Sequence, residues 1–492
     1  MKIQQKISAN NNKRMSADDL LHFILQTNDV FDFFTLLANY VKENDGACTH
    51  YISWVNASSS NEVIHRISSG MSMLRYEVSK SDARLFAEFW YSIANNRKKE
   101  LPLLCLYTLS IFDNQEPELI EEKGQVYAIG PLSTENNPTN MVLYPQPPVS
   151  YQQEHFRCRK MHEGRNTIKC NPSDALSSLK RYSFISKSEL GHYQTNILRY
   201  NPYFEFSEND LVTAVSSIRN KQWFSVNLDH DNKTFTCTYD DPILNQIINE
   251  NICKVIDAAA EKGVHILAFP EMIMNPETED YVKNHLYSHP RISTNVLLIA
   301  LGTVWNDYRN EGCLLSGSGT ELWRGKKRIR YDYFDKNTQQ SYCEDLQDID
   351  GSLNMLDIPG IGRICWEICR DCLAQEVDIA YQRLEANFYI ISAFSSSLAE
   401  MINRAKTYSL QNGAITLAAN YCHCSEEKTE AQRGFIYIPK INGKLLADMQ
   451  PPYCQSKRCI TMDCDHELCA WKCIIHKDLG YTFDELSCCK KI

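Results

Sequence analysis

Short apolar segments alternate with helical segments along the second half of this chain, and this alternation limits the fold more than any other feature. The apolar segments are VHILAFPE (264–271), NVLLIALGT (295–303), GRIC (362–365), FYIISAF (388–394) and ITLAANY (415–421). Helical segments precede or separate them at 243–263, 366–387 and 399–413. Continuous apolar strands are typically buried on both faces, and strands that alternate with helices form layered structures. We therefore expect an α/β fold in which helices cover the sheets.

The length of 492 residues predicts two domains, because a single core rarely grows that large. Residues 1–221 contain helical segments at 18–44 and 79–100, followed by a polar stretch that contains several prolines. We expect residues 1–221 to form a separate mixed α/β N-terminal domain with a regulatory or partner-binding role. The alternating segments predict a second domain over 222–475, followed by a C-terminal tail over 476–492.

The composition is that of a globular protein, with 43% hydrophobic and 23% charged residues. A formal net charge of −10 argues against a general binder of nucleic acid or anionic membranes. The opening sequence, MKIQQKISANNNKRMSADD, lacks the apolar core of a secretory signal, and we find no apolar run as long as a membrane-spanning helix. We expect a cytoplasmic protein whose 20 cysteines are reduced thiols.

Three polar residues stand where apolar strands are expected to end. Glu271 directly follows HILAFP, Lys327 lies in LWRGKKRIRYDY after a short strand, and Cys365 ends GRIC. A helix beginning after Cys365 would favour its thiolate through unpaired N–H groups and the helix dipole. Glu271 could take the thiol proton, while Lys327 and the main-chain N–H of Trp366 could hold an oxyanion. Together these groups would supply the nucleophile, base and oxyanion stabiliser of an acyl transfer.

Each of these residues also has an ordinary structural explanation. A glutamate after Phe-Pro commonly begins a helix, where the dipole favours its charge. A lysine in GKKR is commonly a solvated turn residue. A cysteine at the end of a buried strand commonly packs as a small apolar side chain. The catalytic explanation requires the three side chains to meet in space, whereas the structural explanations do not.

The order of the three residues resembles that of the nitrilase, or carbon–nitrogen hydrolase, superfamily. FPE, then a lysine after a glycine-turn hairpin, then ICWE is similar to the Glu–Lys–Cys signature of that family, and the resemblance covers 222–475. It implies an αββα sandwich that forms homo-oligomers through a helical face. It also implies that Cys365 attacks an amide or nitrile carbon, with Glu271 as base and Lys327 on the intermediate (Lys326 is the fallback). No cofactor is implied.

The resemblance further implies supporting residues around the triad. YCEDLQDIDG is similar to the family stretch that carries a second glutamate, so Glu344 would orient Lys327 or the substrate. Asn420 ends a strand near the implied pocket, and Phe394 and Ser395 follow another strand and would line it. The residues ICRDC replace a proline and a histidine that often follow ICWE in true nitrilases. This leaves both amide and nitrile substrates open and slightly favours the amide.

The remaining cysteines offer a metal or redox alternative. Five cysteines surround His466 at intervals of five, five, five and four: Cys454, Cys459, Cys464, Cys469 and Cys473. Zinc sites usually show closer paired knuckles, so this spacing indicates zinc only loosely and we predict no metal. Cys369 and Cys372 form a C-x-x-C that could be a redox pair, although we favour packing behind Cys365.

Two other classes of function fit the same residues. A catalytically silent nitrilase-like scaffold, or an effector in a multi-component system, would keep the fold without the reaction. A thiol acyltransferase would use the same nucleophile and pass the acyl group to an amine instead of water. A covalent adduct on the nucleophilic cysteine would distinguish an enzyme from a scaffold.

Overall fold

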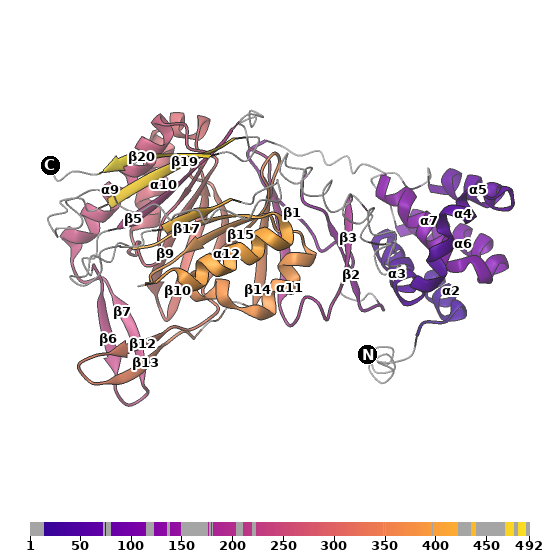
Figure 1. Ribbon diagram of the computed structural model, residues 1–492, viewed down its shortest axis with the longest axis horizontal. Coiled ribbons are helices and arrows are strands. Elements are labelled where there is room, and N and C mark those ends of the chain that lie inside the picture. The colour runs from indigo at the N-terminus through magenta and orange to yellow at the C-terminus, as the bar shows by residue number, and fades with distance from the viewer. Residues whose placement is uncertain are drawn as a thin grey trace.

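Two seven-stranded sheets face each other in the computed structural model of the protein, and helices cover their outer faces (Figure 1). This is the αββα arrangement that the sequence predicted. The structure describes residues 14–71, 74, 80–114, 123–134, 138–148, 176, 179, 181–202, 210–218, 223–347, 349, 351–395, 397–421, 434–438, 468–476 and 481–488.

The first sheet has the strand order β1-β4-β14-β15-β16-β17-β18. Its strands are β1 (Val126–Gly130), β4 (Gln194–Tyr200), β14 (Ser352–Ile358), β15 (Gly362–Ile368), β16 (Phe388–Ser392), β17 (Ile415–Ala419) and β18 (Gly434–Tyr437). Strands β15, β16 and β17 are parallel, so each connection between them needs a crossover, and helices α11 (Gln375–Arg383) and α12 (Ala399–Asn412) supply these crossovers. Helix α12 ends at Gly413, which adopts a left-handed conformation with φ 65° that glycine tolerates without strain.

The second sheet has the strand order β11-β10-β9-β8-β5-β19-β20. Its strands are β11 (Glu321–Lys326), β10 (Arg309–Ser316), β9 (Leu298–Asn306), β8 (Ile266–Ala268), β5 (Asp210–Ile218), β19 (Leu468–His476) and β20 (Tyr481–Cys488). Helices α9 (Pro242–Glu261) and α10 (Thr278–Ser288) pack on this sheet. Helix α9 begins where Asp241 accepts hydrogen bonds from the N–H groups of Ile243 and Leu244, with a proline in its first turn.

The space between the two sheets is filled by apolar side chains that alternate along the strands. On β15, Ile364, Trp366 and Ile368 point into this core. Each fully buried side chain of this size stabilises the fold by roughly 1.5–3 kcal/mol. The Trp366 ring fits because two neighbouring residues are glycines: a Cβ on Gly312 would lie 2.8 Å from it, and a Cβ on Gly325 would lie 3.1 Å from it.

A smaller four-stranded sheet projects from the sandwich, at the lower left of Figure 1. It has the order β12-β13-β7-β6 and is built from the hairpins β6 (Ser225–Asp229) with β7 (Thr234–Thr238) and β12 (Asp332–Asp335) with β13 (Gln340–Glu344). Strands β7 and β13 are parallel neighbours, which joins the two hairpins although they are distant in sequence. This small sheet matters because several of its side chains face the candidate site.

The N-terminal region forms a unit with its own apolar core. Its helices are α2 (Ala17–Gln26), α3 (Val30–Glu43), α4 (Tyr51–Val55), α5 (Asn61–Met71), α6 (Lys80–Ala94) and α7 (Leu101–Asn114), with short 3-10 turns at Asp45–His50, Ser58–Ser60 and Asn95–Glu100. Leu143 and Tyr182, from the hairpin β2 (Met141–Pro145) and β3 (Tyr182–Ser186), complete the core. The predicted mixed α/β character of this region is therefore confirmed, while its role stays a prediction.

The boundary predicted between residues 221 and 222 does not separate the sheets. Strands β1, β4 and β5 precede it and yet pair within the sandwich, because β4 lies parallel to β14 and β5 lies parallel to β8. Strand β20 also pairs with β19, so the predicted tail over 476–492 contributes a strand. Alternation of strands and helices begins only after β5, and this is why the sequence placed the boundary too late.

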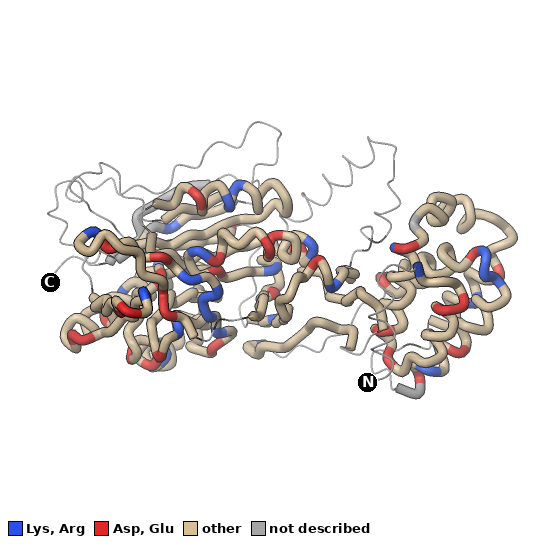
Figure 2. The backbone as a smooth tube through the Cα atoms, turned by 90° about the horizontal axis from the view of Figure 1, so that it is seen from below, with Lys and Arg blue, Asp and Glu red and all other residues tan. Residues whose placement is uncertain are grey.

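Positive and negative side chains are interspersed along the described chain (Figure 2). The described part of the chain therefore carries both signs of charge along its length. Among the described residues, no helix combines the length and the apolar composition needed to cross a bilayer.

Candidate active site

Glu271 and Lys327 meet at the end of the second sheet. Glu271 follows β8 after Phe269 and Pro270, and Lys327 directly follows β11. The Lys327 Nζ lies 2.8 Å from the Glu271 Oε1, and both side chains are only 3% exposed. The structure therefore brings these two strand ends together. The next residue, Met272, has a φ of 60°, and its N–H donates to the Thr303 hydroxyl at 2.9 Å, which fixes the turn that carries Glu271.

Glu344 joins the pair from the end of β13. The Lys327 Nζ lies 2.8 Å from the Glu344 Oε2, so one ammonium bridges two buried carboxylates. Burial alone would lower the pKa of Lys327, but Glu271 and Glu344 outweigh it and hold that pKa well above its usual range. Burial raises the pKa of the Glu344 carboxyl, and Lys327 opposes the rise. The structure thus places Glu344 beside Lys327.

Asn310 is a site residue that the sequence reasoning missed. Its Nδ2 donates to the Glu271 Oε1 at 2.9 Å and to the Glu344 Oε1 at 3.1 Å. The main-chain N–H of Lys327 donates to the Asn310 carbonyl at 2.8 Å. The Tyr331 N–H completes the set by donating to Glu344 Oε2 at 3.0 Å. Asn310 is the second residue of β10, between Arg309 and Glu311, and no sequence signal marked it as part of the site.

Two cysteines line the cavity at this site, Cys237 on β7 and Cys369, and the candidate nucleophile is Cys369. It has a φ of 49°, begins the 3-10 turn Cys369–Leu373 and lines the cavity that contains the two glutamates. Its thiol lies near the Glu271 carboxylate and the backbone of Phe394. Burial, together with the negative charge of Glu271, raises the pKa of this thiol, whereas Lys327 and the Phe394 backbone lower it. Cys369 therefore needs a base to become a thiolate at neutral pH.

The placement of Cys365 contradicts the prediction that it faces Glu271 and Lys327. Strand β15 continues to Ile368, so Cys365 lies in mid-strand and does not open a helix. Side chains alternate along β15, and Cys365 points to the opposite face from Trp366, where it packs among Tyr381 and Tyr389 under the helices. Cys369, predicted to pack behind it, instead occupies the turn after the strand.

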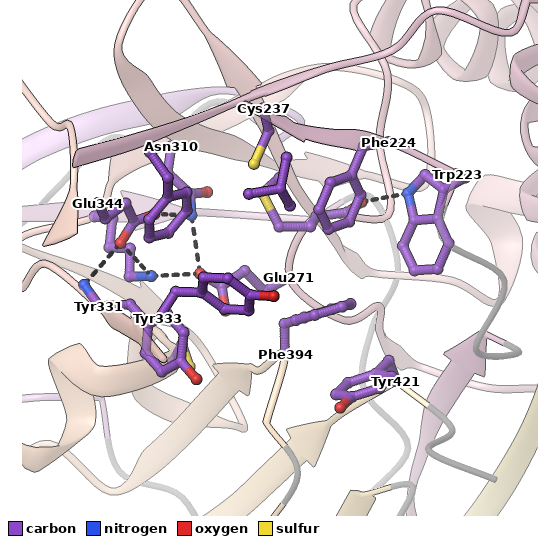
Figure 3. Close-up of a pocket in the computed structure, with 15 residues that line it drawn as sticks. Trp223, Phe224, Cys237, Glu271, Asn310, Tyr331, Tyr333, Glu344, Phe394 and Tyr421 are labelled. Atoms are coloured by element: carbon purple, nitrogen blue, oxygen red, sulfur yellow. Dashed lines mark hydrogen bonds and ion pairs between the residues drawn. The ribbon is translucent and has the colours of Figure 1, made fainter. Parts of the chain in front are cut away.

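The cavity has a polar end and an aromatic end and a volume of ≈ 240 Å³. Figure 3 shows Asn310 and Glu344 at one end, Glu271 in the middle, and the aromatic end formed by Trp223, Phe224, Phe394 and Tyr421. The rings of Phe394 and Tyr421 are stacked with centroids 4.0 Å apart, and Trp223 meets Phe394 edge-on at 6.1 Å. Tyr331 is 41% exposed and connects the cavity lining to the surface. The predicted lining role of Phe394 is consistent with this position.

The other predicted residues lie near the site without lining it. The Asn420 side chain accepts a hydrogen bond from the Ser395 N–H at 2.9 Å and donates one to the Ser395 carbonyl at 2.8 Å, so it holds the loop after Phe394. The Ser395 hydroxyl donates to the Ser397 carbonyl. Trp366 lies between the sheets and donates from Nε1 to the Ser392 hydroxyl at 3.0 Å. Its main chain is paired in β15, which corrects the prediction that its N–H binds an oxyanion.

A buried acidic group fixes the segment that follows Lys327. The Asp371 carboxylate accepts hydrogen bonds from the N–H groups of Arg328 at 3.0 Å and Ile329 at 2.7 Å. The Arg328 guanidinium pairs with Glu367, which also accepts a hydrogen bond from the Tyr381 hydroxyl. Burial raises the pKa of Asp371 to about 7, although Arg328 and the two N–H donors oppose the shift. Because Asp371 belongs to the turn that begins at Cys369, it joins the cysteine to the lysine segment.

Metal binding finds no support in the part of the chain that the structure describes. No group of three His, Cys, Asp or Glu side chains is placed there to hold an ion. Of the C-terminal cysteines, Cys473 is buried on β19, and Cys454, Cys459, Cys464 and His466 lie outside the described residues. Lys327 occupies the space between Glu271 and Glu344, so a cation there would first have to displace its ammonium.

No family model matches the sequence, and no curated protein is similar to it. The search of solved structures finds a mutant amidase from Nesterenkonia sp. AN1, in which acrylamide has added to the active-site cysteine. It is 14% identical, with a TM-score of 0.32, and the match covers 47% of this chain and 87% of that one. That amidase is a member of the nitrilase superfamily.

Two further solved structures are similar at the same level. The NitFhit protein of C. elegans is 12% identical, with a TM-score of 0.33 over 56% of this chain and 61% of that one. A glutamine-dependent NAD⁺ synthetase from Acinetobacter baumannii is 11% identical, with a TM-score of 0.35 over 54% of this chain and 45% of that one.

Proposed function

We propose that the protein is a thiol-dependent hydrolase of a non-peptide carbon–nitrogen bond, in an amide or a nitrile, with Cys369 as its nucleophile. The observation that carries this proposal is that Glu271, Lys327 and Cys369 line one cavity, where the Glu271 carboxylate accepts a hydrogen bond from the Lys327 ammonium at 2.8 Å and lies near the Cys369 thiol. A base between a thiol and a fixed cation is the arrangement that acyl transfer through a thioester needs.

The reaction on an amide begins when Glu271 accepts the proton of the Cys369 thiol and the sulfur forms a bond to the carbonyl carbon. The carbonyl oxygen gains negative charge, which Lys327 is placed to stabilise. Because its pKa lies well above the usual range, Lys327 keeps its positive charge throughout. The carbon–nitrogen bond then breaks, and Glu271 returns the proton to the departing ammonia or amine. A water molecule, activated by Glu271, cleaves the thioester to give a carboxylic acid and the free thiol.

Glu344 and Asn310 keep Lys327 and Glu271 in these positions. Without Glu344, the Lys327 ammonium would have Glu271 as its one ion-pair partner among the described residues of the site. Asn310 spaces the two carboxylates by donating to both. We therefore assign both residues to positioning and the chemical steps to Cys369, Glu271 and Lys327.

A covalent adduct provides a direct test. When the protein is mixed with a panel of small amides and nitriles and quenched in acid, we expect mass spectrometry to find the acyl group on the peptide that contains Cys369. In Glu271→Gln, adduct formation should be slowed by roughly 10²–10⁴-fold, because the thiol loses its base. If Cys369 stays unmodified across the panel and resists alkylating reagents, the protein acts as a scaffold instead.

Asp371 offers a second test, of positioning. Asp371→Ala removes the acceptor of two N–H groups, so the Lys327 segment should shift and kcat should fall by about 10–100-fold. Asp371→Asn retains Oδ1, which accepts both bonds, and should recover most of the kcat. Equal loss in both variants, with unchanged folding by circular dichroism, would show that the charge of Asp371 matters and not its position.

A further inference from the structure

We infer that the site takes the primary amide of a neutral, apolar carboxylic acid, with an aromatic or branched aliphatic acyl group. This inference rests on the proposed function and narrows it in two respects. It selects the amide over the nitrile, and it excludes substrates whose acyl group carries a second carboxylate. Two independent features of the cavity support it.

The first feature is a buried acceptor that has no donor. Asn310 is 1% exposed and lines the cavity, and its Oδ1 has no hydrogen-bond partner among the described residues. The side-chain orientation is fixed because Nδ2 must be the atom that donates to Glu271 and Glu344. An unpaired buried acceptor is costly. The Oδ1 atom is itself buried, so a ligand reaches it when the lining shifts, and the NH₂ group of a primary amide could then satisfy it while a nitrile nitrogen could not.

The second feature is the charge of the lining. Of the described residues that line the cavity, Lys327 is the only cation, and Glu271 and Glu344 already occupy it at 2.8 Å each. A carboxylate on the acyl group would find no free counter-charge and would be repelled by the two glutamates. The acyl group instead meets the aromatic end of the cavity, where Phe394 and Tyr421 present large apolar faces.

Residues 223–238, which include the β6–β7 hairpin, form much of this apolar wall. Trp223, Phe224, Val226, Phe235 and Cys237 all line the cavity. Val226 and Cys237 are direct partners across the hairpin, so they present neighbouring side chains to the same face. The Trp223 ring nitrogen donates to the Met272 carbonyl at 2.6 Å, which ties this wall to the residue after Glu271. We therefore assign acyl-group specificity to this segment.

Small substrates test the inference with the full-length protein. Isobutyramide is compared with the matching nitrile, isobutyronitrile, and with succinamate, which carries a second carboxylate; benzamide is an aromatic comparison. We expect kcat/KM for the two apolar amides to exceed that for succinamate by at least about 100-fold, because of charge repulsion in a buried site. The amide should exceed the matching nitrile by at least about 100-fold, because Asn310 selects an N–H donor.

A variant that introduces a positive charge tests whether the apolar wall sets the specificity for the acyl group. Val226 is partly exposed, so Val226→Arg can place a guanidinium beside the acyl group, and we expect it to raise kcat/KM for succinamate about tenfold. The matched variant Val226→Gln should leave succinamate as poor as before. Preference of the native protein for succinamate or for the nitrile would overturn the inference while leaving the hydrolase intact. Failure of every substrate to acylate Cys369 would instead overturn the proposed function.

Discussion

Replacing Cys369 by alanine is expected to lower kcat/KM by on the order of 10⁴-fold or more, because the thiol beside Glu271 that forms the thioester is lost. Cys369 lies in a turn with a φ of 49°, and alanine keeps the same backbone constraints apart from the sulfur. Folding should therefore change little. The measurement is the hydrolysis of an apolar primary amide, followed by released ammonia.

Cys365→Ala is the matched control. Cys365 is fully buried under the helices, so removal of its sulfur leaves a small cavity that should cost about 1 kcal/mol of unfolding free energy. Its activity should stay within about threefold of the native protein when measured below the unfolding transition. A folded Cys365→Ala protein that has lost activity, beside a Cys369→Ala protein that retains it, would show that our assignment of the nucleophile is wrong.

The two cysteines also show where sequence reasoning was sufficient and where it was not. Glu271 and Lys327 were found because each follows a strand, and strand ends that share an edge of a sandwich bring their side chains together. Glu344 was found through the resemblance of YCEDLQDIDG to a family stretch. The end of β15 was predicted too early because GRICWEI is buried along its whole length, so the segment has no alternation of buried and exposed residues that would mark where the strand ends. Strand β15 ends three residues later than predicted. Cys365 therefore lies in mid-strand and faces away from the site, and Cys369 lies in the turn that enters it.

The aromatic wall and Asn310 depended on tertiary contacts that have no local pattern. The β6–β7 hairpin reaches the site only because β7 pairs with β13, more than a hundred residues later in the chain. Asn310 looks like an ordinary polar residue at the start of a strand until Glu271 and Glu344 are placed on either side of it. The N-terminal strands β4 and β5 were likewise assigned to the wrong domain because their partners are remote in sequence.

The largest effect on stability is expected from Lys327→Met. This change leaves the Glu271 and Glu344 carboxylates buried together without their common cation, and breaking such an ion pair costs roughly 3–5 kcal/mol. Activity should also be lost, since the oxyanion has no cation to stabilise it. Lys326→Met is the matched control: it removes a partly exposed lysine one position earlier and should cost less than about 1 kcal/mol.

The loss of stability in Lys327→Met should depend on pH in a defined direction. Burial already raises the pKa of Glu344 in the native protein, and removal of the ammonium that opposes this rise should raise it further. A carboxyl whose pKa is higher in the folded than in the unfolded state holds a proton that unfolding releases. Folding is therefore favoured below the folded pKa, and this contribution is lost as pH rises through the interval between the two values.

Urea unfolding of Lys327→Met at pH 5 and pH 8 tests this direction. We expect the midpoint, relative to the native protein at the same pH, to fall more at pH 8 than at pH 5. The double variant Lys327→Met with Glu344→Gln removes one of the two carboxylates, so it should recover part of the stability at pH 8 and lose most of the pH dependence. An equal fall at both pH values would mean that the two glutamates are not held charged against each other, and that Lys327 stabilises the fold through packing alone.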